Sequence, residues 1–332
     1  MLLDSLFKSK SEIVNLKSGL YHYTRENEFE KSRLHLRIDP DGVGTLIVNA
    51  NRVMHLNPTA TLMAWLVLEK VEEGQAVKTI QQKYRVSRTQ ARADYSSFIF
   101  HLSSLFTDAC PVHELEFDTT MPFSDRPSAP YRMDLAVTYR CNNDCAHCYN
   151  ARERNFPELK TDDWKKILDQ LWALGVPHIV FTGGEATLRD DLPELIRHAE
   201  SNGQITGLNT NARRLADAAY AQKLVDAGLD HVQITVESCD EQIHDEMMRV
   251  NCAFKQTIAG LKNVLSTRLY VMTNTTMLRT NVHTIPETLD FLAEIGVPTI
   301  GLNALIYSGH GLTVGTGLRE SELQPILDVA TQ

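Results

Sequence analysis

Hydrophobic residues follow two different patterns along this chain, one on each side of a proline-rich stretch. In the first part, β-prone residues alternate or cluster in three short runs, and the turn sequence DPDG at 39–42 lies between the first two. Three segments of helical character follow. The strand-like runs cover residues 33–38, 43–49 and 52–56, and the helical segments cover 56–74, 76–86 and 87–106. This order predicts a small sheet followed by three helices.

The first and third of these helices carry signals for their ends. Asn57 is placed to cap the first helix, Pro58 favours its first turn, and Gly74 is placed to end it. Ser87 is placed to cap the third helix, because its hydroxyl can accept a hydrogen bond from the first turn. A short sheet with three such helices predicts a small, winged-helix-like α+β domain.

The stretch at 119–131 has three prolines, polar spacers and no hydrophobic period. We expect an interdomain linker there, with one domain over residues 1–118 and another over 132–332. In the second domain, strand-like runs alternate regularly with helical segments. The expected strands cover 132–139, 178–182, 205–210, 231–237, 269–277 and 299–306, and the expected helices cover 161–175, 192–202, 216–227, 253–265, 284–295 and 320–332.

That alternation predicts the fold of the second domain. Strands separated by helices form a parallel sheet with right-handed crossovers. Six strand-helix units are too few to close a TIM barrel, so the sequence predicts an α/β fold with a (βα)6 partial TIM barrel. We expect Thr161 to cap the first helix of this domain and Gly175 to end it. In such a fold, chemistry takes place at the carboxyl ends of the strands.

Composition excludes several classes of protein. The chain has 332 residues, of which 43% are hydrophobic, and a net charge of −9. Residues 1–120 carry 14 Lys and Arg against 15 Asp and Glu, so this part lacks the basic surplus of a nucleic-acid-binding domain. No signal peptide is recognisable, and the longest apolar run, at 62–68, is far shorter than the ~20 residues that span a bilayer. We therefore expect a cytoplasmic protein with no membrane and no nucleic-acid partner.

Three of the six cysteines lie within eight residues, in the sequence RCNNDCAHCYN at 140–150. Cys141, Cys145 and Cys148 directly follow the first strand of the second domain, where a barrel of this kind has its active site. Cytosolic thiols stay reduced, so we expect a metal site or catalysis rather than disulfides. Soft thiolates at close spacing favour zinc or an iron-sulfur cluster.

The fourth ligand of such a site is missing from the sequence. His147 lies between two of the cysteines and is a poor candidate, because a two-residue loop usually directs its inner side chains away from the metal. Cys110, Cys239 and Cys252 are isolated and are expected to act as small hydrophobic residues. Three thiolates with one open coordination position therefore remain. An iron-sulfur cluster with one iron free of protein ligands fits this pattern best, and zinc or a chance grouping are the alternatives.

The sequence CNNDCAHC matches the CxxxCxxC motif of the radical S-adenosylmethionine superfamily, which the chain resembles over residues 132 to about 310. The resemblance implies a [4Fe-4S] cluster and S-adenosylmethionine as cofactors, with the methionine amino and carboxylate groups bound to the open iron. It also implies an electron donor protein. Reductive cleavage of S-adenosylmethionine would then give a 5′-deoxyadenosyl radical that abstracts a hydrogen atom from the substrate.

The sequence FTGGEATL follows the second strand of this domain. Two adjacent glycines allow the backbone to approach a ligand closely, and Glu185 can accept a hydrogen bond from an ammonium group. The alternative is a plain strand-to-helix turn with an acidic residue near a helix N-terminus. The resemblance implies that this motif holds the methionine amino group, with cofactor contacts from Thr182, Gly183, Gly184 and Glu185.

Polar residues also end the next two strands. Asn209, Thr210 and Asn211 end the third strand, and Thr235 and Glu237 lie at the end of the fourth. The resemblance implies that these residues contact the ribose and the methionine carboxylate, although Thr235 and Glu237 replace the Ser and Asp more usual in the family. Turn formation is the alternative interpretation.

Further residues near these motifs are candidates on position alone. Arg249 is a candidate partner for the cofactor carboxylate, and a solvated arginine at a helix end is the alternative. His147 and Tyr149 flank the cysteines and either shield the cluster, lie near the adenine, or pack within the loop. Asn274 and the segment 307–312 are weaker candidates still, and simple loop chemistry is the favoured interpretation of both.

The first domain gives the only indication of a substrate. Its layout and the segment HLNPTATLMAWLVLEKVEEG at 55–74 resemble PqqD-like precursor-recognition domains, in which a leader peptide adds a strand to the edge of the sheet. The resemblance implies that residues 1–118 bind a ribosomally made precursor peptide, which the second domain modifies. The alternatives are a small-molecule or tetrapyrrole substrate, a noncatalytic iron-sulfur sensor and, for the first domain, DNA binding. Relatives of this layout often carry a cysteine-rich C-terminal extension, and the sequence leaves its presence open.

Overall fold

The computed structural model describes residues 16–26, 31–50, 52–104, 128–151 and 157–330. Contacts between residues divide the chain into two compact units. The first unit comprises Met1–Tyr131 with Leu171–Pro177, and the second comprises Arg132–Gln170 with His178–Gln332. Most of the linker expected at 119–131 lies outside the described residues, as does Cys110. No helix in the described part of the chain is long and apolar enough to cross a membrane.

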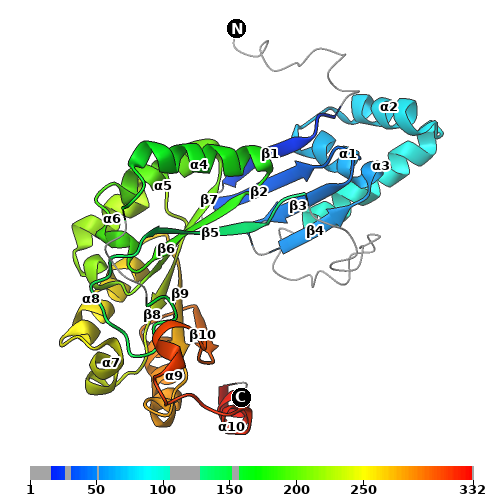
Figure 1. Cartoon of the computed structure of the whole chain (residues 1–332). Helices are drawn as coiled ribbons and strands as arrows, with labels where there is room; N and C mark the ends of the chain where they lie inside the picture. Colours follow the sequence, from blue (N-terminus) through cyan, green and yellow to red (C-terminus); the bar gives the residue numbers. More distant parts are fainter. Residues whose placement is uncertain (1–15, 27–30, 51, 105–127, 152–156, 331–332) are drawn as a thin grey trace. The chain divides into compact units, whose positions relative to one another are not determined.

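The first unit is a small antiparallel sheet followed by three helices (Figure 1). Within the described residues the sheet has four strands in the order β1-β2-β3-β4, one more than the sequence predicted. The additional strand is β1, an edge strand that pairs with β2 along its whole length. The strands are β1 (Gly19–Glu26), β2 (Lys31–Ile38), β3 (Gly44–Val48) and β4 (Arg52–Leu56), and the helices are α1 (Pro58–Leu68), α2 (Glu73–Tyr84) and α3 (Arg88–Ser104).

One hydrophobic core joins this sheet to the helices. Leu36 and Leu46 from the sheet, Leu62 and Leu66 from α1, and Ile80 from α2 are almost completely buried. Their burial stabilises the unit because it removes apolar surface from water. The order of elements confirms the predicted winged-helix-like α+β layout, apart from the additional edge strand.

The predicted helix ends are partly right. Asn57 caps α1, since its Oδ1 accepts a hydrogen bond from Ala60 N at 2.9 Å. Ser87 Oγ accepts one from Gln90 N at 3.2 Å at the start of α3. Gly74 does not end α1, which stops at Leu68. Instead Gly74 lies inside α2, because the Glu72 side chain accepts from Gln75 N and starts a new helix there.

The second unit contains a six-stranded parallel sheet within the described residues, in the order β10-β9-β8-β7-β6-β5. This arrangement confirms the six strand-helix units and the partial barrel expected from the sequence. Its strands are β5 (Arg132–Thr138), β6 (His178–Gly183), β7 (Ile205–Thr210), β8 (His231–Thr235), β9 (Tyr270–Thr276) and β10 (Thr299–Asn303). Its helices are α4 (Thr161–Leu174), α5 (Leu192–Asn202), α6 (Ala218–Asp226), α7 (Glu241–Met248), α8 (Ala253–Leu265), α9 (Ile285–Glu294) and α10 (Glu320–Ala330), with 3-10 turns η2 (Ala186–Leu188), η3 (Arg213–Ala216), η4 (Val282–Thr284) and η5 (Gly309–Leu312).

Two details of this unit differ from expectation. The short helix α7, between β8 and α8, was not predicted. Thr161 does not cap α4 either, because the helix already includes it and its hydroxyl donates to Asp191 Oδ2 at 2.6 Å. Gly175 follows the last residue of α4 with φ of 94°, a left-handed conformation that favours glycine, and it ends the helix as expected.

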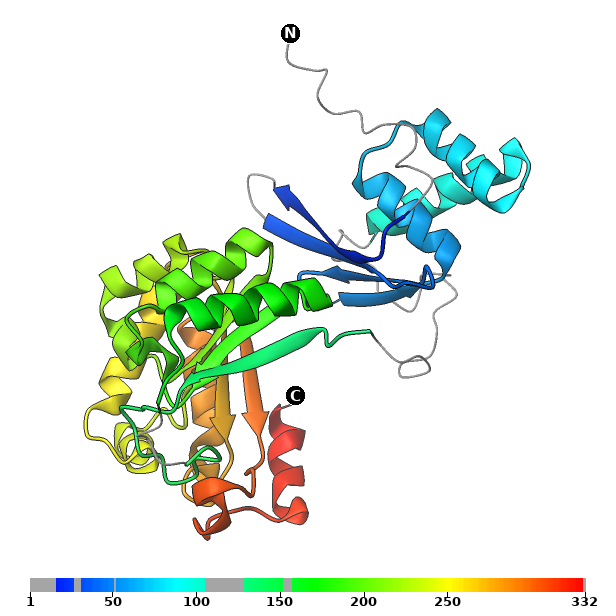
Figure 2. The same ribbon diagram turned by 45° about the horizontal axis from the view of Figure 1, so that its top comes forward.

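The two faces of this sheet differ in burial. Side chains on alternate residues of the strands are fully buried, among them Phe181, Leu208, Val232 and Val271. The intervening residues toward the strand ends are half-buried and mostly polar. They are Thr182, Asn209, Gln233, Thr235, Met272 and Asn274. Figure 2 shows α4, α5 and α6 along one side of the sheet, and we call the half-buried side the open face.

A histidine pair lies near the other end of the strands. The Nε2 atoms of His178 in β6 and His231 in β8 are 2.7 Å apart. β7 passes between them at Gly207, where a Cβ atom would come within 2.1 Å of the His231 ring. Burial, together with the nearby Arg132 charge, lowers the pKa of His231 to about 4.

This pKa predicts a specific dependence of stability on pH. The unfolded chain binds a proton at His231 near pH 6.5, whereas the folded chain does so only near pH 4. This contribution to the free energy of unfolding is therefore fully present above pH 6.5 and is lost as the pH falls through 4, by on the order of 3 kcal/mol. Chemical denaturation at several pH values should show this loss, and His231→Asn should flatten it. His283→Asn, at an exposed histidine, is the control; equal slopes for all three proteins would contradict the assignment.

Candidate functional site

The cysteine loop, residues 140–150, follows β5 at the carboxyl edge of the sheet. Cys141, Cys145 and Cys148 are all half-buried, and none of them is part of a disulfide. Burial raises the pKa of the Cys145 thiol, and the charges of Cys148 and Cys141 raise it further. Deprotonation therefore needs a positive partner such as a metal ion.

The end of α7 holds the middle of this loop. Ala146 N donates to Met247 O at 2.8 Å, and Asp144 N donates to Met248 O at 3.2 Å. The Met248 thioether also accepts from Asn143 Nδ2 at 3.1 Å and from the Cys145 thiol at 3.4 Å. Because α7 was not predicted from the sequence, these contacts were not foreseen. They align the loop backbone with the end of a helix about 100 residues further along the chain.

Arg213 holds the start of the loop from η3. Its guanidinium donates to the Asn142 carbonyl and, at 2.7 Å, to Asn143 Oδ1. Nε of the same side chain donates to Gln256 Oε1 at 2.7 Å. Asn211, at the end of β7, adds a hydrogen bond from its Nδ2 to Asn142 Oδ1 at 2.7 Å. Asn211, a candidate from the sequence, therefore contacts the loop. Arg213, which was not predicted from the sequence, contacts it as well.

The segment at 307–312 holds the end of the loop, although the sequence suggested only ordinary loop chemistry there. His310 N donates to Cys148 O at 2.9 Å, and His310 Nδ1 lies 3.0 Å from Cys145 O. Gly309 has φ of 55°, and a Cβ there would come within 2.5 Å of Cys148 O. Only glycine fits so close to the loop backbone without a shift.

The two glycines after β6 pack against the chain itself. A Cβ at Gly183 would come within 2.0 Å of Thr138 O, and one at Gly184 within 2.4 Å of Arg140 O. Gly184 N and Glu185 N donate to those same carbonyls at 2.8 Å. The close approach that the sequence suggested for a ligand is thus made by the backbone that leads into the cysteine loop. Thr182, just before them, is half-buried on the open face.

Glu185 is buried and joins the ends of β6 and β7. Oε1 accepts from Thr187 Oγ1 and Thr210 Oγ1, both at 2.7 Å, and Oε2 accepts from Asn211 N at 2.8 Å. With 1% of its surface exposed, the carboxylate is held by protein donors on both oxygens. Thr210 is buried with it, whereas Asn209 is half-buried on the open face. Contact of Glu185 with a cofactor amine stays a prediction.

Glu237 lies just beyond β8 and is completely buried. Its Oε1 is 2.9 Å from His147 Nε2 in the cysteine loop, and its Oε2 accepts from Thr276 N at 2.6 Å. Thr235, two residues earlier, is half-buried on the open face and pairs in register with Asn274 of β9. The structure therefore brings His147 and Glu237 together, whereas Thr235 lies half-buried on the open face.

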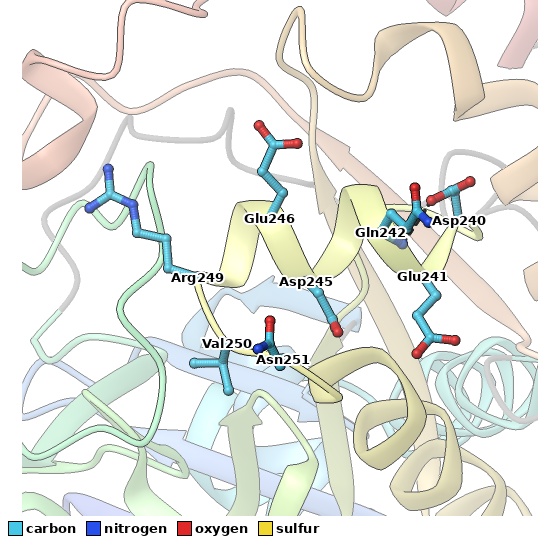
Figure 3. A pocket seen from close by; sticks show the side chains of 8 residues that line it. All are labelled: Asp240, Glu241, Gln242, Asp245, Glu246, Arg249, Val250 and Asn251. Atoms are coloured by element: carbon cyan, nitrogen blue, oxygen red, sulfur yellow. Dashed lines mark hydrogen bonds between the residues drawn. The ribbon is translucent and has the colours of Figure 1, made fainter.

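Arg249 directly follows α7, with φ of 54°. Its Nη1 is 3.8 Å from Asp144 Oδ2 of the cysteine loop, and both side chains are about half exposed. An ion pair so exposed contributes little to stability. Figure 3 shows this stretch, where a hollow is lined by residues 240–242, 245–246 and 249–251 and the Arg249 side chain extends away from the helix. Arg249 remains beside the cysteine loop and accessible to a ligand.

Two further residues of the open face were missed by sequence reasoning. Gln233 of β8 lies beside Asn209 of β7 and Met272 of β9 in the strand register. All three are half-buried, and they form one row across neighbouring strands. Strict alternation within each strand was the signal that would have identified Gln233 and Met272, because every second residue faces the same side.

The cysteine loop fits an iron-sulfur cluster in its donor chemistry. Three cysteines that form no disulfide lie on one short loop, and thiolates are the usual ligands of such clusters. Among the described residues, no three His, Cys, Asp or Glu side chains converge on the position of a single metal ion. In a cubane cluster each thiolate binds a different iron, so its ligands have no need to converge on one point.

Comparison with known proteins identifies two families. Residues 135–304 match the family described as the Radical SAM superfamily, which covers just over half of the chain. Residues 38–105 match the family described as coenzyme PQQ synthesis protein D, or PqqD. The first match lies in the second unit except for Leu171–Pro177, and the second match lies in the first unit.

Curated relatives share about a third of the aligned residues. An Fe-coproporphyrin III synthase from Methanosarcina barkeri is 34% identical over 203 residues, which are 60% of this chain and 48% of the relative. A PqqA peptide cyclase from Bradyrhizobium diazoefficiens is 34% identical over 185 residues, which are 55% of this chain and 48% of the relative. The chain therefore spans about half the length of the curated relatives it matches.

Solved structures show the same fold. SuiB from Streptococcus suis, crystallised with its precursor peptide SuiA, matches with a TM-score of 0.64 and 16% identity over 89% of this chain and 67% of SuiB. The protein anSMEcpe, solved with AdoMet and the Cp18Cys peptide, matches with a TM-score of 0.51 and 14% identity over 61% of this chain and 59% of its own. At these identities the likeness concerns the fold alone.

The contacts of Arg213 predict that it stabilises any metal held by the loop. Arg213→Gln removes the donors to Asn142 and Asn143, so anaerobically reconstituted protein should lose iron to a chelator about tenfold faster. Arg268→Gln is the matched control, because Arg268 precedes β9 and donates to Val225 O. Equal iron loss from the two variants would show that Arg213 does not support the loop.

Proposed function

The chain belongs to the radical SAM superfamily, and from this premise we propose that it is an enzyme that abstracts a hydrogen atom from a ribosomally made precursor peptide. We propose a [4Fe-4S] cluster and S-adenosylmethionine as its cofactors. The observation that carries the proposal is the group of three cysteines, none of them in a disulfide, on one short loop at the carboxyl edge of a partial barrel. Reduced thiols suit the cytoplasm, where we place the enzyme.

In this proposal Cys141, Cys145 and Cys148 each hold one iron, and the cofactor completes the fourth. When bound, the reduced cluster supplies one electron that breaks a carbon–sulfur bond of S-adenosylmethionine, giving methionine and a 5′-deoxyadenosyl radical that takes a hydrogen atom from the substrate. An electron donor protein must deliver that electron. The residues of this chain bind, orient and shield the reactants.

The burial of the candidate residues divides their proposed roles. Thr182, Asn209 and Thr235 are half-buried on the open face, where a cofactor can reach their side chains. Glu185 and Thr210 are buried and hydrogen-bonded to each other, so they hold the carboxyl edge of the sheet in place. The backbone of Gly183 and Gly184 keeps the cysteine loop against that edge. Asn211 and Arg249 lie next to the loop, and we retain both as cofactor contacts.

A peptide substrate is supported by the first unit. Its match to PqqD coincides with β3, β4 and the three helices, and its antiparallel sheet ends in the edge strands β1 and β4. An edge strand has free backbone groups that can pair with an extended peptide. One group of relatives is named PqqA peptide cyclase, and SuiB, which shares the fold, was crystallised with its precursor peptide SuiA. We propose that residues 1–118 bind the precursor in this way.

A tetrapyrrole substrate is the second candidate. The relative named Fe-coproporphyrin III synthase is as similar to this chain as the peptide cyclase is, at 34% identity. Sequence identity therefore does not separate the two substrates. The peptide is favoured because of the first unit, which matches PqqD. The barrel does not need this unit for its chemistry, so we assign it to recognition of the substrate.

The cluster assignment predicts the outcome of cysteine substitution. Anaerobically reconstituted protein should hold about four irons per chain, and with dithionite it should convert S-adenosylmethionine to 5′-deoxyadenosine. Serine at Cys141, Cys145 or Cys148 should abolish this product and most of the iron, whereas Cys239→Ser and Cys252→Ser should retain both. Bound zinc, or full iron without 5′-deoxyadenosine, would instead indicate a structural metal site or a sensor.

The substrate assignment predicts which molecule changes during turnover. Candidate precursor peptides and iron-coproporphyrin III are incubated separately with the reduced enzyme and S-adenosylmethionine, and their masses are then measured. We expect a peptide to lose hydrogen or gain a crosslink in proportion to the 5′-deoxyadenosine formed. A change in the tetrapyrrole, with every peptide unaltered, would establish the second candidate.

A further inference from the structure

Glu237 is held by the chain through hydrogen bonds at its backbone N, its carbonyl and one carboxylate oxygen. Its backbone N donates to His244 Nδ1 at 3.2 Å, and its carbonyl accepts from Asn281 Nδ2 at 2.7 Å. Its carboxylate accepts from Thr276 N at 2.6 Å and approaches His147. With 0% of its surface exposed, the side chain offers no accessible oxygen to a bound molecule. A direct contact with the cofactor, as its place after β8 suggested, would need this arrangement to open.

His147 is the residue through which Glu237 can act. The imidazole lies in the loop between Cys145 and Cys148, with only 11% of the side chain exposed. Nε2 is 2.9 Å from Glu237 Oε1, without the alignment of a well-formed hydrogen bond. Nδ1 is buried and has no hydrogen-bond partner among the described residues. A buried polar atom without a partner costs free energy unless another molecule supplies one.

The carboxylate is also close to the thiols. Its charge contributes to the raised pKa of Cys145, after burial and the neighbouring cysteines. Glu237, His147 and the ligand cysteines therefore form one compact group, which Thr276 and His244 anchor to the barrel. Residues that orient the immediate contacts of a metal centre commonly affect its affinity about 10- to 100-fold without touching it.

We propose that Glu237 is a positioning residue: it fixes the His147 imidazole within the cysteine loop, and His147, not Glu237, contacts the bound S-adenosylmethionine. This inference rests on the proposed function and changes the role of Glu237 within it. The carboxylate sets the orientation of the ring, and Nδ1 is the atom left for a group outside the chain. Removal of either residue then disrupts the same single contact.

A double-mutant cycle tests this coupling in the full-length, reconstituted protein. The variants are Glu237→Gln, His147→Phe and the two combined. Three measurements are made on each: iron per chain, the dissociation constant for S-adenosylmethionine by equilibrium dialysis, and the change in the electron paramagnetic resonance spectrum of the reduced cluster on adding S-adenosylmethionine. Glu241→Gln is the control, since Glu241 is a carboxylate of α7 that pairs with Lys255 at 3.0 Å.

We expect each single variant to keep its iron, to bind S-adenosylmethionine about tenfold more weakly and to lose most of the spectral change. The double variant should bind no more weakly than the weaker single variant, because both act on one contact. The control should match the unaltered protein. If Glu237→Gln does not fold, Glu237→Asp replaces it in the same cycle, since the shorter side chain withdraws from His147.

Three results would overturn the inference. Losses that multiply in the double variant would show that Glu237 contacts the cofactor independently of His147. Iron loss in Glu237→Gln, with unchanged affinity per cluster, would show a purely structural role. Unaltered protein that holds a cluster but does not bind S-adenosylmethionine would contradict the proposed function itself, before any variant is compared.

Discussion

The cysteine loop depends on hydrogen bonds that come from outside it. Under the proposed function its thiols bind iron, so they are not available to hold the loop together. The end of α7 holds its middle, Arg213 its start and His310 its end. These partners come from points far apart in the sequence, and only a parallel sheet brings them to one edge, because all its strands end there. The site therefore cannot form without the barrel, which brings the residues that hold the loop to one place.

Buried carboxylates reinforce the same edge. Glu185 joins the ends of β6 and β7, and Glu237 joins the end of β8 to β9 and to the cysteine loop. A buried carboxylate is expensive unless donors surround it, so each one fixes the backbone amides and hydroxyls that it accepts from. The acidic residues thus build the frame of the site, while the neutral polar residues Thr182, Asn209 and Thr235 remain open to ligands.

The sequence predicted what depends on short-range patterns. Alternation within strands and helical periods gave the six parallel strands, and the spacing of Cys141, Cys145 and Cys148 gave the candidate metal loop. Features decided by contacts between distant segments were missed. β1 is an edge strand stabilised by pairing with β2, and α7 is a helix of only eight residues. Neither the contact of Arg213 with the loop nor the glycine packing against β5 follows from any local pattern.

The open face determines what the barrel can accept. A closed barrel of eight strands fills its interior with its own side chains. Six strands leave that side uncovered, and the row formed by Asn209, Gln233 and Met272 stays half exposed beside the edge that carries the cysteines. Under the proposed function, a substrate must bring one particular hydrogen atom to that edge, and the neutral row offers hydrogen bonds and one flexible apolar side chain without a fixed charge. Such a surface can orient a substrate but discriminates weakly between substrates, which supports the proposal that the first unit recognises the substrate.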